Sequence, residues 1–229
     1  MALLTFKRSF QRWALLLLVP VLVSCSPSPR AAVSRGCADA MAACLQGTAT
    51  VVVSTTRGEF TVEVNGDAAP LTGGNFVDLV RRGTYDGTMF HRVIREPVPF
   101  VVQGGDPLSS DRSTPLSQLG TGSFVDPQTG LVRMIPLELG FDGDDQPRYS
   151  REITNPAELD RLTLRHERGA VAMARSQAPD SASAQFYVAL RPLPELDGRY
   201  AVFGRVVDGL DVVDAIEQGD RITKASLGD

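Results

Sequence analysis

The chain has few of the side chains on which most enzymes depend. Its 229 residues include only two histidines, three cysteines and one tryptophan. It has no G-x-S-x-G elbow, no P-loop, no G-x-G-x-x-G after a strand pattern and no H-E-x-x-H motif. These absences argue against a serine hydrolase, a nucleotide-dependent enzyme and a zinc protease. We expect no metal and no cofactor.

The chain also has no excess of positive charge. The formal net charge is −4, so the chain offers no broad basic surface, and nucleic acid is not an expected partner. Hydrophobic residues make up 43% and charged residues 22% of the sequence, which is ordinary for a globular protein. The length suits one domain with a sizeable core plus extensions.

The apolar run Trp13–Val23 is too short to span a bilayer. It has eleven residues, whereas a transmembrane helix needs about 20. Three basic residues precede it, and no acidic residue occurs before Asp39. A basic start followed by a short apolar middle is typical of a secretory signal.

The end of this run resembles a bacterial lipobox, Leu22-Val23-Ser24-Cys25. The resemblance implies a lipoprotein signal peptide over residues 1–24 and lipidation of Cys25. We therefore expect an exported, membrane-anchored lipoprotein that faces the periplasm or an equivalent lumen. The alternatives are an ordinary signal with a chance cysteine and a short membrane anchor. Residues 25–48 are expected to form a linker and a short N-terminal extension.

The two remaining cysteines, Cys37 and Cys44, lie in that extension. Export permits disulfides. If residues 37–44 formed one continuous helix, the Cα atoms would lie about 10.5 Å apart, beyond the roughly 7 Å limit for a bridge. A disulfide therefore requires a turn near Gly36 or a frayed helix start. Two cysteines without a nearby histidine do not indicate a metal site.

From about residue 49 onward, short β-rich runs alternate with two helical patterns, which indicates a closed antiparallel barrel capped at its ends. The helical patterns cover residues 69–83 and 209–218. The predicted strands are Thr50–Ser54, Glu59–Val64, Thr88–Ile94, Phe100–Gln103, Gly169–Arg175, Gln185–Leu190, Tyr200–Val207 and Arg221–Ser226.

Residues 107–165 are the least regular part of the chain. They are rich in Pro, Gly, Asp and Ser. A structureless loop of this length is unusual in a compact domain, so we expect short strands within it, best placed at Leu131–Glu138. The acidic stretch Phe141–Asp145 lacks the ligand spacing of an EF-hand and is expected to be a solvated turn.

Three sequence segments carry the functional signal. The first is Phe90–Asp106, which reads FHRVIREPVPFVVQGGD. The second places Met173-Ala174-Arg175-Ser176 before the segment Ser183–Val188, which reads SAQFYV. The third is Leu196–Gly204, LDGRYAVFG. Together, over about residues 50–106 and 164–226, they resemble the cyclophilin family of peptidyl-prolyl isomerases.

The resemblance implies a mainly β fold: a closed eight-stranded antiparallel barrel with a helix at each end and the site on an outer face. The isomerase domain would cover residues 49–229, with an insertion over about 107–165. It implies that Arg92 is catalytic. The residues that match the proline pocket and peptide groove of the family are Phe100, Val101, Gln103, Ala174, Arg175, Ser176, Gln185, Tyr187, Leu196 and Tyr200.

The sequence departs from the family pattern at several of these positions. Tyr187 stands where a second pocket phenylalanine is usual, so its hydroxyl needs a partner. Val101 replaces a common methionine and gives a smaller wall. Tyr200 replaces a frequent histidine, although its hydroxyl can still donate. Glu195 stands where a tryptophan helps to bind cyclosporin, which predicts weak inhibition by that compound. We interpret His91 as structural.

Rotation about an X–Pro bond suits these residues because it breaks no bond. The barrier is about 18–20 kcal/mol. A guanidinium donor can favour the twisted imide, whose nitrogen regains a lone pair. One charge-assisted hydrogen bond contributes about 1.5–3 kcal/mol, whereas an acceleration of about 10⁵-fold needs about 7 kcal/mol. The apolar pocket must supply the rest. Strand alternation places Phe90 and Arg92 on one face.

Two functions are compatible with this sequence. The first is an isomerase that assists the folding of exported proteins, acting as a monomer on proline-containing segments of its clients. The second is a noncatalytic assembly chaperone that binds such segments on the same fold. Arg92 and Phe100 favour catalysis, while Val101, Tyr187 and Glu195 leave room for the second function.

Overall fold

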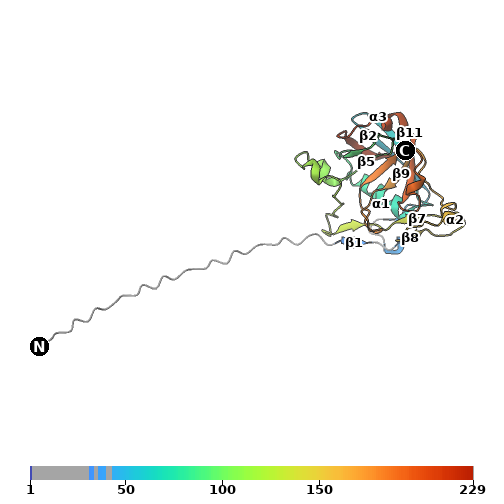
Figure 1. Ribbon diagram of the computed structural model, residues 1–229, viewed down its shortest axis with the longest axis horizontal. Helices are drawn as coiled ribbons and strands as arrows, with labels where there is room; N and C mark the ends of the chain where they lie inside the picture. Colours follow the sequence, from blue (N-terminus) through green and yellow to red (C-terminus); the bar gives the residue numbers. More distant parts are fainter. Residues whose placement is uncertain (2–30, 34–35, 40–42, 229) are drawn as a thin grey trace.

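The computed structural model describes Met1 and residues 31–33, 36–39 and 43–228 (Figure 1). Apart from Met1, the predicted signal peptide lies outside the described residues, and so does Cys25, the predicted site of lipidation. Within the described part of the chain, no helix has both the length and the apolar character needed to cross a membrane.

The core of the fold is one strongly curled antiparallel sheet of eight strands, in the order β12-β2-β3-β11-β9-β10-β5-β4. The mainly β prediction is therefore confirmed. The strands are β2 (Thr48–Thr55), β3 (Gly58–Asn65), β4 (Arg92–Val93), β5 (Val101–Gly104), β9 (Ala170–Met173), β10 (Phe186–Ala189), β11 (Val202–Asp208) and β12 (Ile222–Leu227).

The prediction of a closed barrel was wrong. The edge strands β4 and β12 do not pair, and an isolated bridge between Met89 and Arg221 joins the segments beside them. The predicted strand Thr88–Ile94 divides, because residues 87–90 direct their backbone hydrogen bonds to residues 219–222. Of its residues, Arg92 and Val93 pair in register with β5, and Ile94 adds one backbone hydrogen bond to Val101.

The β2–β3 hairpin follows directly from its side-chain alternation. Val51 and Val53 on β2 face Phe60, Val62 and Val64 on β3, and all five are at most 1% exposed. Alternate residues of a strand point to the same face, so one face of the hairpin enters the core. Burying large apolar side chains in this way stabilises the fold by about 1.5–3 kcal/mol each relative to exposure.

Helix α1 (Pro70–Arg81) packs against β2, β3, β11 and β12. Its N-terminus has no cap from the preceding residue, Ala69. Instead, the buried carboxylate of Glu138, from the insertion, accepts hydrogen bonds from the backbone of Leu71 and Thr72 at 3.0 and 2.7 Å. These bonds satisfy backbone donors that the first turn of a helix leaves free.

The other two helices are short. Helix α3 (Leu210–Ala215) packs against β3, and it ends earlier than the pattern over residues 209–218 predicts. The reason is that Ile216 adopts an extended backbone conformation. Helix α2 (Pro156–Leu159) forms a single turn within the insertion.

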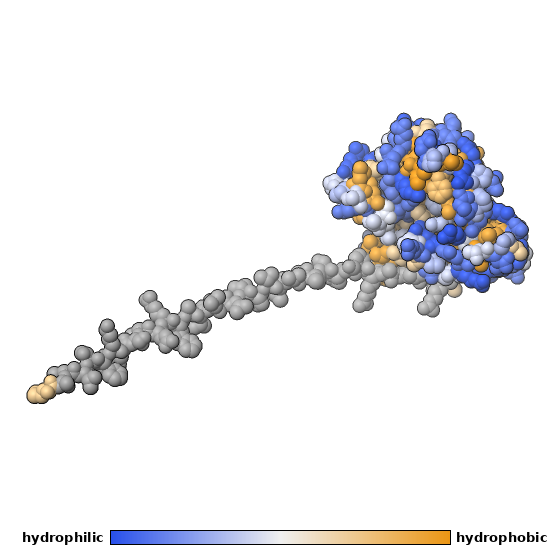
Figure 2. Space-filling view, viewed as in Figure 1, coloured by the Kyte–Doolittle hydropathy of each residue, from blue (hydrophilic) through white to orange (hydrophobic). Residues whose placement is uncertain are grey.

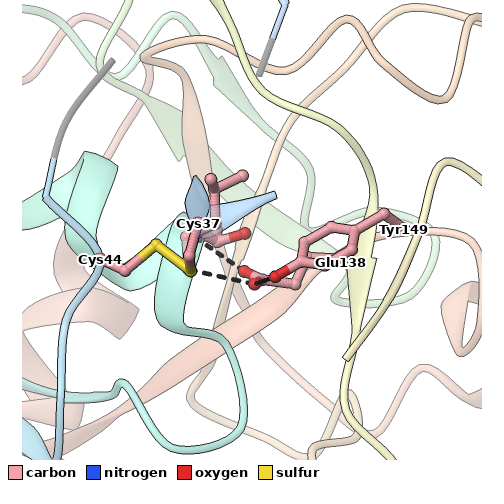
Figure 3. Close-up of a disulfide and its surroundings, with 6 residues drawn as sticks. Cys37, Cys44, Glu138 and Tyr149 are labelled. Atoms are coloured by element: carbon pink, nitrogen blue, oxygen red, sulfur yellow. Dashed lines mark hydrogen bonds between the residues drawn. A yellow bond between two sulfur atoms is a disulfide. The ribbon is translucent and has the colours of Figure 1, made fainter. Parts of the chain in front are cut away.

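A disulfide joins Cys37 to Cys44 with 5.7 Å between the Cα atoms. Cys37–Asp39 forms a 3-10 turn directly after Gly36, at a φ of +150°, so the geometry that a continuous helix would forbid is reached. Figure 3 shows the disulfide beside Glu138 and Tyr149. The Tyr149 hydroxyl donates to the Glu138 carboxylate at 2.9 Å.

Two glycines let this disulfide segment approach α1. A Cβ atom on Gly74 would lie 2.2 Å from the carbonyl oxygen of Ala43, and one on Gly73 would lie 3.3 Å from the Leu45 side chain. Glycine in a helix costs about 1 kcal/mol relative to alanine. The close packing of residues 43–45 explains why α1 tolerates two of them.

The insertion contains short strands, as predicted. A fully buried arginine, Arg133, ties it to α1 through a 2.6 Å ion pair with Asp78 and stacks 4.7 Å from the Phe124 ring. The additional strands are β1 (Ala31–Val33), which pairs with β6 (Val132–Met134), and β7 (Glu138–Leu139), which pairs with β8 (Arg148–Tyr149).

Part of the insertion projects from the body of the molecule (Figure 1). This lobe contains the 3-10 helices Pro107–Ser110 and Leu116–Gln118. Leu108 and Leu116 are exposed there, and the space-filling view shows apolar colour on the lobe within a mostly hydrophilic surface (Figure 2). The acidic stretch 141–145 forms a turn in which Asp144 pairs with Arg148 and Arg161 at 2.7 and 2.6 Å.

Candidate functional site

A cavity of about 280 Å³ opens on the outer face of the sheet. The structure brings together there all of the predicted catalytic and substrate-binding residues except Ser176 and Gln185, which line the neighbouring cavity. The residues around the first cavity are Arg92, Phe100, Val101, Gln103, Ala174, Arg175, Tyr187, Leu196 and Tyr200.

Strand register explains how residues distant in sequence meet here. Arg92 on β4 pairs with Gln103 on β5, and Gln103 pairs with Tyr187 on β10. Directly opposite residues project from the same face of a sheet, so these three side chains form one row. Their neighbours along the strands, such as Val102 and Phe186, point into the core and are fully buried.

Arg92 is exposed, but its guanidinium has two partners at the cavity. Nη1 donates to Oε1 of Gln103 at 3.2 Å, and Cζ lies 5.9 Å from the centre of the Phe100 ring. The sequence expectation that Phe90 shares its face was wrong. Phe90 is fully buried in the core, because the backbone from 87 to 90 pairs with residues 219–222 and the alternation is interrupted before β4.

A chain of two amides holds Gln103 in place. Nε2 of Gln103 donates to Oε1 of Gln185 at 3.2 Å, and Nε2 of Gln185 donates to the carbonyl oxygen of Gly122 at 2.8 Å. A carbonyl oxygen can only accept, so Gly122 fixes the direction of both amides. As a result, the oxygen of Gln103 faces Arg92. Nε2 of His91 lies 3.4 Å from Nε2 of Gln103, and burial lowers the pKa of that histidine.

Asp106, the last residue of the QGGD segment, explains how the insertion reaches this site. Its fully buried carboxylate accepts backbone hydrogen bonds from Gly120 at 2.6 Å, Gly122 at 3.2 Å and Leu108 at 2.9 Å. A Cβ atom on Gly122 would lie 2.0 Å from an oxygen of Asp106. Only glycine allows this approach, so the acid and the glycine together position the carbonyl that holds Gln185.

The Arg175 guanidinium is engaged by the protein itself and joins several neighbouring segments. Nε and Nη2 donate to the carbonyl oxygen of Arg199 at 2.9 and 2.6 Å, and Nη1 donates to the carbonyls of Ser176 and Gln177 at 2.9 and 3.1 Å. Nη2 also pairs with Glu152 of the insertion. The guanidinium has five N–H groups, and these five bonds occupy them.

Tyr187 forms the floor of the cavity, and its hydroxyl has a protein partner. The oxygen lies 2.8 Å from Nε2 of His166, and Nδ1 of His166 lies 2.7 Å from Oδ1 of Asp197. Burial raises the pKa of Tyr187 well above its ordinary value. The sequence indicated that this hydroxyl needed a partner, but it did not identify His166 or Asp197.

Other positions around the cavity are now defined. Val101 is 1% exposed and forms a wall. The guanidinium of Arg175 stacks 4.8 Å from the Tyr200 ring. Glu195 is exposed and pairs with Arg191 at 2.7 Å rather than lining the cavity. Weak inhibition by cyclosporin stays a prediction.

A second cavity of about 390 Å³ adjoins the first and shares Gln103, Ala174 and Arg175 with it. The insertion contributes to this part of the site. Residues of the insertion that line the second cavity are Gly120, Thr121, Gly122, Ser123 and Met134. The first cavity contains an apolar cup, which is formed by Phe100, Val101, Tyr187 and Leu196, and the second cavity adjoins it through the three shared residues.

Comparison with known proteins agrees with this geometry. Residues 50–227 match the family described as cyclophilin type peptidyl-prolyl cis-trans isomerase/CLD. A Synechocystis protein named as a thylakoid lumen peptidyl-prolyl cis-trans isomerase is 39% identical over 193 residues, which cover 80% of this chain and 48% of that protein. The chain thus spans about half the length of that relative. Peptidyl-prolyl cis-trans isomerase-like 1 of Rhizopus delemar is 32% identical over 71% of this chain and 76% of its own length.

Solved structures share the fold. A cyclophilin type peptidyl-prolyl cis-trans isomerase of Cryptosporidium parvum matches with a TM-score of 0.57 and 22% identity, covering 80% of this chain and 98% of that one. The cyclophilin AquaCyp293 of Hirschia baltica matches with a TM-score of 0.54 and 25% identity, covering 80% and 75%. By sequence and by fold, the chain belongs to the cyclophilin-type peptidyl-prolyl cis-trans isomerase family.

Proposed function

We propose that the chain applies the peptidyl-prolyl cis-trans isomerase activity of its family to X–Pro bonds of exported proteins and so assists their folding. Arg92 is the catalytic residue of this proposal. The observation that carries it is the convergence of one oriented guanidinium with Phe100, Gln103 and Leu196 around a single cavity. A cation beside an apolar cup suits an imide that is losing its resonance.

In this mechanism, the pyrrolidine ring of the substrate occupies the cup formed by Phe100, Val101, Tyr187 and Leu196. The remainder of the peptide rotates about the imide bond. As resonance is lost, the imide nitrogen becomes a hydrogen-bond acceptor, and Arg92 donates to it. Such a bond supplies about 1.5–3 kcal/mol, a part of the barrier of about 18–20 kcal/mol.

The rest of the stabilisation comes from positioning. The amide chain from Gly122 through Gln185 and Gln103 holds Arg92 before substrate arrives, so little reorganisation is needed during the reaction. Residues of the substrate beside the proline would lie along the second cavity, near Ala174 and Ser176. The Cryptosporidium parvum isomerase, which has this fold, was also solved in the presence of the dipeptide Ala-Pro, and this supports a proline peptide as ligand.

We further propose that residues 1–24 are a lipoprotein signal peptide, that Cys25 carries the lipid, and that a linker over residues 25–48 joins it to a monomeric isomerase domain over 49–229. The basic start, the short apolar run and the lipobox-like tetrad support export. The lumenal name of the Synechocystis relative supports a lumenal or periplasmic location. Mass spectrometry of the mature N-terminus tests this, because an unmodified residue 25 would contradict it.

A protease-coupled assay on a tetrapeptide with one X–Pro bond tests the catalytic proposal. We expect the purified protein to accelerate cis-to-trans conversion in proportion to its concentration. The alternative, a noncatalytic proline-binding chaperone, is favoured by the buried Tyr187 hydroxyl beside the cup. That alternative predicts that the protein binds the peptide while the conversion keeps its uncatalysed rate.

A further inference from the structure

The floor of the apolar cup is a tyrosine ring with a buried polar end. Tyr187 is 4% exposed and packs with Val101, Ala189 and Val202 in an apolar cluster on the outer face of the sheet. The Tyr200 ring crosses it at 82°, with 5.9 Å between the centroids. The hydroxyl of Tyr187 is buried, so it needs a hydrogen-bond partner if the ring is to present only its carbon atoms to a ligand.

His166 sets that direction. Its side chain has no solvent exposure, and its Nδ1 atom and its backbone nitrogen lie 2.7 and 2.9 Å from the same oxygen of Asp197. An ionised carboxylate only accepts, so Nδ1 carries a hydrogen. In the neutral ring, Nε2 is then an acceptor, and the hydroxyl of Tyr187, 2.8 Å away, donates to it.

The consequence is that the hydroxyl hydrogen of Tyr187 points away from the cup. The His166 and Tyr187 rings lie nearly parallel, with an angle of 12° between their planes and 6.0 Å between their centroids. Burial also raises the pKa of Tyr187, so the floor carries no charge at neutral pH. Without its acceptor, the hydroxyl would stay unpaired in a buried site or turn towards another acceptor, and both are unfavourable for an apolar floor.

We propose that His166, oriented by Asp197, is a positioning residue that fixes the Tyr187 ring as an apolar floor for the pyrrolidine of a bound X–Pro peptide. The inference rests on the proposed isomerase function and deepens it. His166 touches Tyr187 and not the cavity, so it acts through the tyrosine. Tyr187 in place of phenylalanine thereby becomes compatible with a proline pocket.

Kinetics of three variants test this. His166→Leu removes the acceptor and should raise KM about tenfold while kcat stays within about twofold, because the floor binds ground and transition states alike. Tyr187→Phe removes the hydroxyl itself, and its KM is the reference value for the double variant. The double variant Tyr187→Phe/His166→Leu should recover most of the lost affinity, since no hydroxyl remains to be held. An unchanged KM in His166→Leu, or no recovery in the double variant, overturns the proposal.

Tyr85→Phe is a matched control. It removes another buried tyrosine hydroxyl, which donates to the carbonyl oxygen of Ala184 at 2.9 Å in the main core. We expect it to lower the melting temperature without changing KM. If Tyr85→Phe raises KM as much as His166→Leu does, the effect is general loosening and the positioning role is rejected.

NMR of the wild type keeps the test open if His166→Leu fails to fold. The chain has only two histidines, so a ¹⁵N spectrum of the imidazoles shows two rings, and His91→Asn identifies them. We expect a hydrogen on Nδ1 and none on Nε2 of His166, and a shift of Nε2 when an Ala-Pro peptide saturates the site. A hydrogen on Nε2, or no shift at saturation, contradicts the proposal.

The wild-type isomerase rate distinguishes failure of the proposed isomerase function from failure of the positioning role of His166. A wild type that binds the peptide without accelerating its isomerisation removes the proposed function, and the dissociation constants of the same variants then test the floor. An active wild type in which the His166 variants and spectra stay unchanged rejects the positioning role alone.

Discussion

Nε2 of Gln185 lies 2.8 Å from the carbonyl oxygen of Gly122, so the insertion holds one end of the amide chain that reaches Arg92. The insertion is therefore a part of the site and not only an addition to the surface. The Asp106 carboxylate in turn holds Gly122 by accepting a hydrogen bond from the backbone N–H of Gly122. An irregular segment thus orients the guanidinium through two glutamines.

Gln185→Ala should lower kcat/KM about tenfold, because the Gln103 amide loses the partner that fixes its direction and Arg92 loses its orientation. The melting temperature should change little, since Gln185 is only half-buried. The measurement is the isomerase assay together with thermal unfolding. Gln146→Ala, an exposed glutamine elsewhere in the insertion, serves as control. Equal activity in both variants would show that the amide chain has no role.

Glu152→Gln tests the link between the insertion and Arg175. The Arg175 side chain is 5% exposed, and removing the charge of its partner should lower the free energy of unfolding by about 1–3 kcal/mol. Glu63→Gln removes the partner of the exposed Arg205 at 3.0 Å and should change stability by less than about 0.5 kcal/mol. Urea unfolding of both variants measures the difference. Equal losses of unfolding free energy would contradict a structural role for the Glu152–Arg175 pair.

Replacing Cys37 and Cys44 together with alanine should cost about 2–3 kcal/mol of stability, because the bridge closes a short loop in the unfolded chain. Isomerase activity should stay at the wild-type level, since the disulfide lies beside Glu138 and Tyr149 (Figure 3) and neither cysteine lines the cavity. Denaturant unfolding and the isomerase assay are made on the same samples. Loss of activity in a fully folded variant would connect the disulfide to the site.

Glu138 predicts a specific pH dependence of stability. Burial raises its pKa above the ordinary value of 4.5, so the folded state binds this proton more tightly than the unfolded state. The free energy of unfolding should therefore fall as pH rises from about 4.5 towards the folded pKa. Glu138→Gln has no carboxyl to ionise and should lack this component. Urea unfolding at a series of pH values compares the two slopes, and identical slopes would refute the assignment.

The sequence predicts those parts of the fold that depend on local patterns. Alternation at Phe60, Val62 and Val64 predicts β3, and the core confirms it. The pattern over Thr88–Ile94 fails because residues 87–90 pair with residues 219–222, far along the chain. No local signal indicates which distant segment receives those hydrogen bonds.

The same limit applies to the site. Arg92, Gln103 and Tyr187 could be chosen from their motifs, yet their common row depends on the register of three strands. His166, Asp197 and Glu152 could not be chosen, because their importance arises only from contacts with Tyr187 and Arg175. Tyr187, which has a hydroxyl where phenylalanine is usual, was the one site residue whose sequence position indicated that a hydrogen-bond partner was needed.

The proposed mechanism requires that the oriented guanidinium of Arg92, beside an apolar cup, favours the twisted imide. The most direct test measures isomerisation of an X–Pro tetrapeptide by wild type and by Arg92→Ala, with unfolding curves as a check on folding. We expect Arg92→Ala to lose at least about tenfold in kcat, the loss expected for one charge-assisted hydrogen bond, while its unfolding is unchanged because Arg92 is exposed. Equal rates for the two proteins would contradict it.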